Sequence, residues 1–164
     1  MFRSGIGYDI HRFKPGRKLV LGGVEIPHTD GLEGHSDADV LLHAISDALL
    51  GAIAERDIGH HFPNSDESIR GISSLEILRR VKELLANRNA TVINIDATLI
   101  AEAPKIGPHL EPMREKISSA LGISKASVGI KATTNEGLGA LGRGEGIAAL
   151  AVASVEQSEG PPIA

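Results

Sequence analysis

Carboxylate and imidazole side chains are concentrated near the start of the chain. Asp9 and His11 lie in the segment Gly5–His11, and Asp39 and His43 follow about thirty residues later. If the first segment is a strand, Asp9 and His11 point to the same face. If the second opens a helix, Asp39 and His43 lie one turn apart. Two such elements could hold a divalent metal through Asp and His and leave one position open for substrate.

Asp9, His11 and His43 also have an ordinary interpretation, as polar surface residues or helix caps. An Asp-x-His pair alone is a weak signal, because short motifs match by chance. Asp39 and Asp47 could orient the ligating side chains through hydrogen bonds. Both could equally be solvated carboxylates of the helix surface.

Two further segments could bind phosphate. His35 and Ser36 stand at a predicted helix start, where free N–H groups favour anions, although an ordinary N-cap has the same composition. Lys131–Glu136 ends a predicted strand with two hydroxyls, an amide and a carboxylate, and glutamate suits a hard ion such as Mg²⁺. Gly137–Gly146 resembles a phosphate loop but lacks the Gly-Lys-Ser/Thr ending, so a structural turn with an Arg143–Glu145 ion pair is the alternative.

Two loop-like segments could contact the rest of a ligand. Asp57–Ser68 is rich in Gly, Pro, Asn and Asp and could bind hydroxyl groups, or it could simply be a loop. Ala101–Lys105 has small residues that leave room for a flat ligand, and Lys105 could meet a phosphate. A strand-to-helix turn with a surface lysine explains that segment equally well.

Composition narrows the class of protein. The 164 residues are 41% hydrophobic, enough for a folded core. Aromatic residues make up 2% and the net charge is −4, which argues against a nucleic-acid surface. Without cysteine, any metal must bind to His and carboxylate. No apolar signal segment or membrane-length run occurs, so we expect a soluble cytoplasmic protein.

Hydrophobic periodicity predicts an α/β (α+β) sandwich, with a mixed sheet and helices over one face. We expect one domain over residues 1–157 and a flexible tail over residues 158–164.

In the first strand, the alternation places Ile6, Tyr8 and Ile10 opposite Gly7, Asp9 and His11. In a later strand it places Ile93, Ile95, Ala97 and Leu99 on one face. The predicted strands are Arg3–His11, Leu19–Leu21, Val24–Ile26, Val92–Ile100, Val128–Ala132 and Ile147–Val155. The predicted helices run from Ser36 or Asp37 to about Ala54, from Ser73 or Ser74 to about Ala86, and from Pro108 or Glu111 to Leu121.

Segments in a specific order over almost the whole chain resemble the 2-C-methyl-D-erythritol 2,4-cyclodiphosphate synthase family of the non-mevalonate isoprenoid pathway. No single segment is decisive, but their order and spacing together are specific. Asn135 stands where many relatives carry a third Thr, and Ala140 where relatives often carry Phe. The matching segments are Gly7–His11, Gly22–Pro27, His35–Val40, Asp47–Gly51, Asp57–Gly59, Phe62–Pro63, Ala103–Lys105, Lys131–Thr134 and Gly142–Gly146.

The resemblance implies a lyase that forms a cyclic diphosphate. In the family, a CDP-linked methylerythritol 2-phosphate attacks its own β-phosphate and CMP leaves. The nucleophile is already an anion, so catalysis should consist of positioning and charge neutralisation. The family fold assembles as a homotrimer with active sites between subunits, and its central cavity accepts isoprenoid-like diphosphates.

Site residues are carried over by position. The resemblance implies Zn²⁺ on Asp9, His11 and His43, Mg²⁺ or Mn²⁺ on Glu136, and phosphate contacts in the transition state from His35 and Thr134. It implies substrate contacts from Asp57, Ile58, Gly59, Phe62, Pro63, Asn64, Ser65 and Asp66, and from Ala101, Glu102, Ala103, Pro104, Lys105, Thr133, Asn135 and Arg143. Arg143 and Glu145 match residues that line the trimer cavity.

Two other functions remain open at this stage. A metal-dependent phosphoesterase would use the same ligands to activate water, but no obvious water-activating base accompanies them. A non-catalytic trimer that binds metal or isoprenoid diphosphate would need neither Thr134 nor Glu136 nor Lys105. We expect the cyclising enzyme.

Overall fold

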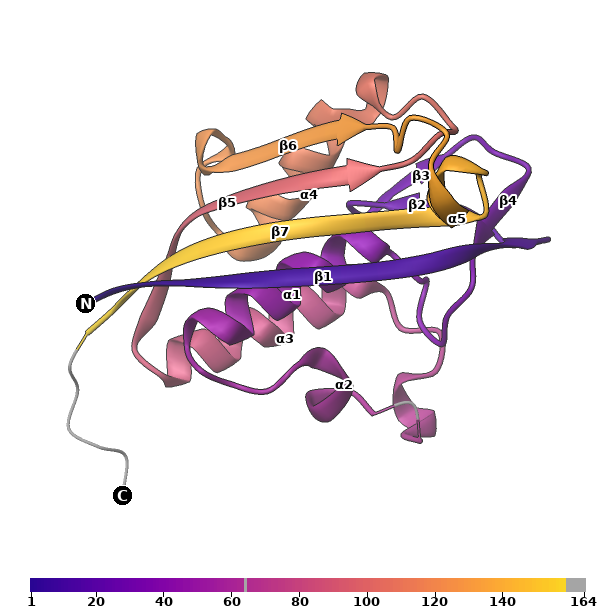
Figure 1. Ribbon diagram of the computed structural model, residues 1–164. Helices are drawn as coiled ribbons and strands as arrows, with labels where there is room; N and C mark the ends of the chain where they lie inside the picture. Colours follow the sequence, from indigo (N-terminus) through magenta and orange to yellow (C-terminus); the bar gives the residue numbers. More distant parts are fainter. Residues whose placement is uncertain (64, 159–164) are drawn as a thin grey trace.

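The structure is a computed structural model that describes residues 1–63 and 65–158. Its centre is a five-stranded mixed sheet in the order β4-β1-β7-β5-β6 (Figure 1). β1 pairs antiparallel with β4 and β7, β7 pairs antiparallel with β5, and β5 pairs parallel with β6. The sheet strands are β1 (Phe2–Pro15), β4 (Asp30–Leu32), β5 (Ala90–Ile100), β6 (Val128–Thr133) and β7 (Gly146–Gln157). A separate hairpin consists of β2 (Leu19–Leu21) and β3 (Val24–Ile26).

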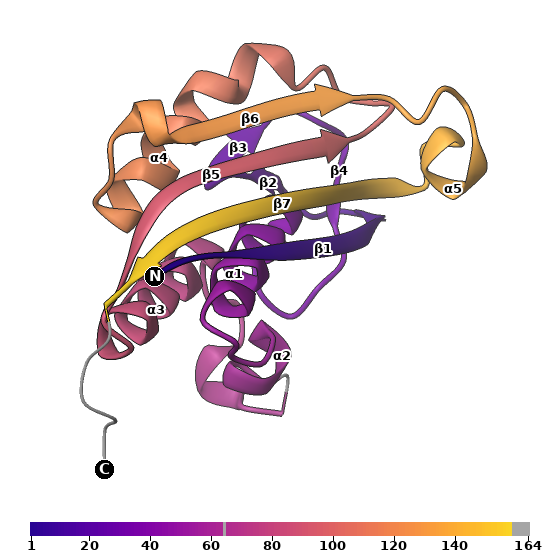
Figure 2. The same cartoon turned by 60° about the vertical axis from the view of Figure 1, so that its left-hand side comes forward.

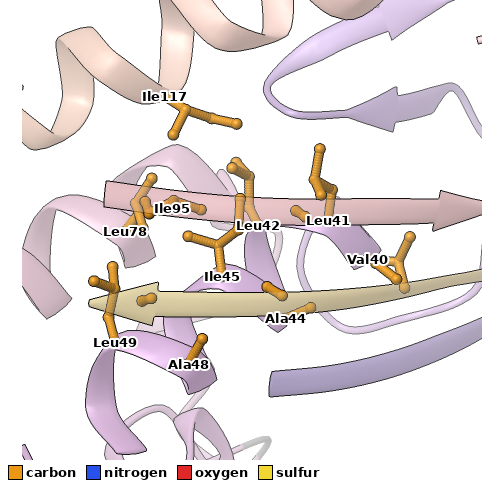
Figure 3. Close-up of a cluster of buried hydrophobic side chains, with 14 of the residues drawn as sticks. Val40, Leu41, Leu42, Ala44, Ile45, Ala48, Leu49, Leu78, Ile95 and Ile117 are labelled. Carbon is orange, nitrogen blue, oxygen red and sulfur yellow. The ribbon is translucent and has the colours of Figure 1, made fainter. Parts of the chain in front are cut away.

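Three helices lie on the same face of the sheet, as predicted (Figures 1 and 2). They are α1 (Val40–Ala52), α3 (Ser74–Asn87) and α4 (Leu110–Leu121). Figure 3 shows side chains of α1 packed with Leu78 of α3, Ile117 of α4 and Ile95 of β5. Because aromatic residues are rare, this core consists mainly of Leu, Ile, Val and Ala.

β1 and α1 approach each other closely through glycine. A Cβ on Gly7 would overlap the carbonyl oxygen of Ala44, and a Cβ on Gly5 would overlap that of Ala48. The two glycines alternate with Ile6, so they share the face that carries Asp9 and His11. The missing side chains therefore let α1 lie directly against the strand that bears these two polar residues.

Most predicted elements are confirmed, with shifts of a few residues at their ends. The second helix begins after the N-cap Ser73, and the third ends at Gly122, whose φ of 68° suits glycine. α1 is an exception, because the predicted cap at Ser36 or Asp37 is wrong. The cap is Asp39, whose side chain accepts a hydrogen bond from the Leu42 N–H.

Short elements were missed. β4 was not predicted, and Asp57–Ser68 is not a continuous loop, since it contains α2 (Ile58–His61) and a 3-10 turn at Glu67–Ile69. The glycine-rich segment contains one helical turn, α5 (Gly139–Gly142). A single turn has too few residues to show a hydrophobic period.

A bulge in β5 changes the predicted alternation. The register with β7 shifts between Val92 and Asn94, so the extra residue Ile93 faces away from the helices and Val92 is buried with Ile95. The prediction holds from Ile95 onward and is wrong for Val92 and Ile93. An inserted residue reverses the face of every residue before it.

The other face of the sheet carries exposed apolar side chains. Ile6, Tyr8 and Ile10 of β1 lie there, as the alternation predicted, beside Leu150 and Val152 of β7. Figure 2 shows no helix of the described chain over this face. We call these five residues the bare sheet face. Separately, within residues 1–63 and 65–158 no helix is both long and apolar enough to cross a membrane.

Candidate metal centre and neighbouring pockets

Asp9, His11 and His43 converge although β1 and α1 are separated in sequence. Asp9 Oδ2 lies 2.8 Å from His11 Nε2 and 3.0 Å from His43 Nδ1. His11 Nε2 and His43 Nδ1 are 3.2 Å apart. One ligand atom from each residue lies within 4.8 Å of the other two, which is compact enough for a single ion. Among the described residues this is the only group of three or more His, Asp or Glu side chains found with such spacing.

The donor set fits a divalent metal chemically. One carboxylate and two imidazoles leave one position of a tetrahedral ion open, the arrangement found in catalytic zinc sites. The far nitrogen of His11 is already paired, since His11 Nδ1 lies 2.5 Å from the Glu33 carbonyl oxygen. That carbonyl can only accept a hydrogen bond, so a neutral His11 ring keeps its proton on Nδ1 and offers the Nε2 lone pair to an ion between Asp9 and His43.

Electrostatics in the cluster favour a charged carboxylate. Burial raises the pKa of Asp9, but hydrogen bonds from His11 and His43 and their charge outweigh it and leave this pKa well below the usual range. Burial alone would lower the pKa of His11. The hydrogen bond to Asp9 and the charge of Asp9 outweigh this effect, so the pKa of His11 is raised above its usual value. The cluster therefore keeps a negative carboxylate next to imidazole nitrogens.

The cluster opens into a cavity of about 460 Å³. His35 and Asp47 line it, so the predicted phosphate contact lies beside the metal ligands. From the polar segment after α1, Asp57, Ile58, Gly59, Phe62 and Asp66 line it as well. Of the other predicted contacts in this segment, Pro63 and Ser65 are not among its lining residues, and Asn64 lies outside the described residues.

Asp39 and Asp47 bind backbone N–H groups rather than the side chains of the metal ligands. Asp39 is fully buried and accepts hydrogen bonds from the N–H groups of Gly22, Gly23 and Leu42. Burial raises its pKa to about 6, although these N–H groups oppose the rise. Asp39 thus ties the β2–β3 turn to the start of α1, while Asp47 accepts from the Ile58 N–H.

The side chains against the far nitrogen of His43 are two serines. Ser74 Oγ lies 3.0 Å and Ser36 Oγ 3.1 Å from His43 Nε2. Sequence reasoning treated Ser36 as a phosphate-binding or capping residue and Ser74 as a helix start. No sequence signal connects either serine to His43, because α3 reaches this site only through tertiary packing.

A second pocket of about 290 Å³ lies at the ends of β5 and β6. The predicted contacts Ala101, Glu102, Pro104, Lys105, Thr133 and Thr134 line it. Ala103 is not among its lining residues, although the Ala103–Pro104 peptide bond, which is cis, lies in the same segment. Glu102 accepts hydrogen bonds from the N–H groups of Asn135 and Gly137, which shapes the loop after β6.

Glu136, Arg143 and Glu145 lie on the exposed surface. Glu136 has a φ of 51°, and its carboxylate accepts a hydrogen bond of 3.2 Å from the Thr134 hydroxyl. Arg143 Nε and Glu145 Oε1 form an ion pair of 2.7 Å, as the sequence suggested. Neither Thr134 nor Glu136 lines the metal cavity: Thr134 lines the second pocket, and Glu136 is among the lining residues of neither.

Comparison with known proteins reveals close relatives. A family model described as the YgbB family matches residues 2–156. A curated protein of Alkaliphilus metalliredigens, named 2-C-methyl-D-erythritol 2,4-cyclodiphosphate synthase, is 61% identical over 158 residues, 96% of this chain and 99% of that protein. A protein of the same name from Syntrophomonas wolfei is 55% identical over 156 residues, 95% of this chain and 99% of that protein.

Solved structures share the fold. A 2C-methyl-D-erythritol-2,4-cyclodiphosphate synthase in a CDP-bound form superposes with a TM-score of 0.86 at 35% identity, over 94% of this chain and 100% of that one. The bifunctional IspDF from Campylobacter jejuni gives a TM-score of 0.92 at 36% identity over 96% of this chain. This chain spans 43% of the length of that bifunctional protein.

Proposed function

The chain belongs to the YgbB family, and on that premise we propose that it is a 2-C-methyl-D-erythritol 2,4-cyclodiphosphate synthase. The substrate would be 4-CDP-2-C-methyl-D-erythritol 2-phosphate. An oxygen of the 2-phosphate forms a bond to the β-phosphorus, the bond from that phosphorus to the oxygen shared with the α-phosphate breaks, and CMP leaves. The observation that carries the proposal is the Asp9–His11–His43 cluster opening into a cavity lined by both polar and apolar side chains.

The attacking 2-phosphate and the diphosphate both carry negative charge, so the protein must bring the attacking oxygen to the β-phosphorus and offset their repulsion. Asp9, His11 and His43 would hold a Zn²⁺ ion, which would supply Lewis acidity toward a phosphate oxygen. Glu136 would help to hold Mg²⁺ or Mn²⁺, which would supply a second positive charge for the diphosphate. His35 beside the cluster and Thr134 at the second pocket donate hydrogen bonds to phosphate oxygens.

The remaining substrate contacts divide between the two pockets. Residues 57–59 and 62–66 bind the methylerythritol part, since most of them line the metal cavity. Residues 101–105, Thr133 and Asn135 bind the cytidine diphosphate, with Lys105 at the phosphates. We assign Arg143 to the same set of residues, which bind the cytidine diphosphate.

A homotrimer would unite the two half-sites. The metal cavity and the second pocket share no lining residue, and one substrate must reach both. The bare sheet face offers an apolar surface that a second copy could cover. In the trimer, Arg143 and Glu145 would line a central cavity for an isoprenoid diphosphate. Light scattering should show the mass of three chains, and a stable, active monomer would contradict the proposal.

We further propose that residues 1–157 act as one domain, since one buried core connects the sheet and its helices. The proposed location is the cytoplasm, and cell fractionation would check it.

Phosphorus NMR tests the reaction directly. Purified protein incubated with the CDP-linked substrate and Mg²⁺ should produce the cyclic diphosphate and CMP, and a chelator should abolish both. Inorganic phosphate as the product would instead indicate a phosphoesterase. Intact substrate in the presence of metal-loaded protein would indicate a binding role.

A further inference from the structure

The two ring nitrogens of His43 have different neighbours, and these neighbours affect which nitrogen carries the proton. Nδ1 faces Asp9 Oδ2 at 3.0 Å, and Nε2 faces Ser74 and Ser36. Neutral imidazole carries one proton, and only the unprotonated nitrogen can bind a metal. With the proton on Nδ1, His43 would donate to the Asp9 carboxylate and could not act as a ligand beside it. A group that accepts from Nε2 and cannot donate to it would oppose this form and favour the one that binds a metal.

Donor and acceptor accounting identifies the group that does so. The Ser74 hydroxyl donates to Asp37 Oδ1, and the Ser74 N–H donates to Asp37 Oδ2 at 3.0 Å. An ionised carboxylate can only accept, so the proton of the Ser74 hydroxyl is committed to Asp37. The Ser74 oxygen can then interact with His43 only by accepting the Nε2 proton.

Ser36, the second hydroxyl beside His43 Nε2, does not favour one position of the His43 proton over the other. Its Oγ accepts a hydrogen bond from the Ala38 N–H at 3.0 Å, and within residues 1–63 and 65–158 no carboxylate is found to accept the proton of its hydroxyl. Its hydroxyl could therefore donate to His43 Nε2 or accept from it. The first arrangement would leave the proton on Nδ1, opposite Asp9, which is the form that blocks the metal.

The position of Asp37 supports this role. Its carboxylate lies at the N-terminal end of α3, a 14-residue helix whose partial positive charge favours a carboxylate. It also accepts from the Asp39 N–H at 3.3 Å, next to the residue that caps α1. Asp37 thus connects the starts of the two helices that carry Ser74 and His43, and Ser74 itself is fully buried.

We propose that Asp37 and Ser74 are positioning residues, which keep the His43 proton on Nε2 and so direct the Nδ1 lone pair toward Asp9 and His11. The inference rests on the metal site of the proposed function. It adds Ser74 of α3 as a partner that orients the His43 ring for metal binding. Partners of this kind, which orient a ligating histidine, typically change metal affinity by about 10- to 100-fold.

The first test reads the tautomer without metal. In metal-free protein, ring ¹⁵N shifts from two-bond correlation spectra should show a larger share of protonated Nε2 in the wild type than in Ser74→Ala. Asp9 favours a proton on Nδ1 in both proteins, and Ser74→Ala removes the acceptor that opposes it at Nε2. An unchanged His43 tautomer in Ser74→Ala would overturn the inference.

The second test measures Zn²⁺ affinity by competition with a chromophoric chelator. Ser74→Ala should bind Zn²⁺ roughly 10- to 100-fold more weakly than the wild type. Ser73→Ala is the matched control, because Ser73 caps the same helix through the Leu75 N–H and has no contact with His43 among its hydrogen bonds. Its Zn²⁺ affinity should stay within about threefold of wild type if only helix capping is lost. Equal weakening in both variants would assign the effect to α3 stability and overturn the inference.

Asp37→Ala gives an independent answer if Ser74→Ala does not fold. It removes the carboxylate that holds the proton of the Ser74 hydroxyl, so this hydroxyl is free to donate elsewhere. Ser74 then donates to His43 Nε2, and both the tautomer and the Zn²⁺ affinity should change as in Ser74→Ala. A His43 tautomer and a Zn²⁺ affinity equal to those of the wild type would refute the proposal. If the wild type itself binds no Zn²⁺, the proposed metal site fails, while the tautomer measurement still decides the roles of Ser74 and Asp37.

Discussion

The metal cavity and the second pocket differ in how completely one chain builds them. In the metal cavity, ligands from β1 and α1 have polar partners on their far sides, and most of these side chains are buried or half-buried. In the second pocket, Thr133 is exposed at the end of β6, and Lys105 and Thr134 are exposed on the segments that follow β5 and β6. A site on regular elements is held in place by the core, whereas a site on loops depends on what binds to it.

This difference suggests two stages of assembly. The metal cavity should form in each folded chain, because glycine contacts, helix caps and buried hydrogen bonds all lie within that chain. The second pocket should become complete only with nucleotide, a second ion or a neighbouring subunit. Variants of the first region should therefore change stability and metal affinity, and variants of the second should change turnover alone.

The largest effect is expected from His43→Ala. Loss of one of three ligands should lower Zn²⁺ affinity by more than about 100-fold, a larger loss than removal of an outer partner, and should abolish turnover. Metal analysis after dialysis measures this, with His109→Ala, outside the cluster, as the control. Unchanged metal content would refute the ligand assignment.

Gly7→Ala tests whether close packing of β1 on α1 holds the cavity. The added methyl group overlaps backbone, which cannot move aside as a side chain can, so the free energy of unfolding should fall by about 3 kcal/mol and Zn²⁺ affinity should fall with it. Urea unfolding measures the stability.

Gly51→Ala is the matched control, since its Cβ would lie 3.8 Å from the nearest atom and alanine favours a helix. A stable Gly7→Ala protein with normal Zn²⁺ affinity would show that the glycines do not position the site.

Asp39 makes the stability of the metal region depend on pH. Burial raises its pKa from 3.8 to about 6, so between these values the folded state keeps a proton that the unfolded state has lost. Its contribution to the free energy of unfolding is therefore present at low pH and declines as the pH rises toward 6. At about 1.4 kcal/mol per pKa unit, the decline amounts to roughly 3 kcal/mol at most.

Urea unfolding at several pH values between 4 and 7 measures this decline. The difference between wild type and Asp39→Asn should shrink as the pH rises, because asparagine does not titrate. A constant difference across this range would mean that Asp39 has the same pKa in both states.

The smallest effect on the folded chain is expected from Thr134→Ala in the second pocket. Loss of one hydroxyl at the phosphates should lower turnover by about 10- to 100-fold, with unchanged stability and Zn²⁺ affinity. Thr91→Ala, an exposed threonine at the opposite end of β5, is the control. Wild-type turnover would remove the proposed role of Thr134, and reduced Zn²⁺ affinity would show that the two pockets are not independent.

Much of the fold follows from local patterns in the sequence. Alternation in β1 correctly predicted which face carries Asp9 and His11, and the two strands on either side of Gly22-Gly23 were predicted with the bounds of β2 and β3. The β5 bulge, β4 and the one-turn helices could not be predicted in this way. Each depends on neighbours that are distant in sequence or is too short to show a period.

For the candidate site, the sequence by itself determined the chemistry of the ligands, because without cysteine only histidine and carboxylate remain. The tertiary structure alone decided their geometry, since Gly5 and Gly7 let α1 approach β1 closely enough to bring His43 Nδ1 within 3.0 Å of Asp9. It also placed Ser74 behind His43. No pattern within α3 could reveal that contact, because a buried hydrogen bond between helices depends on how they pack and not on the order of residues in either one.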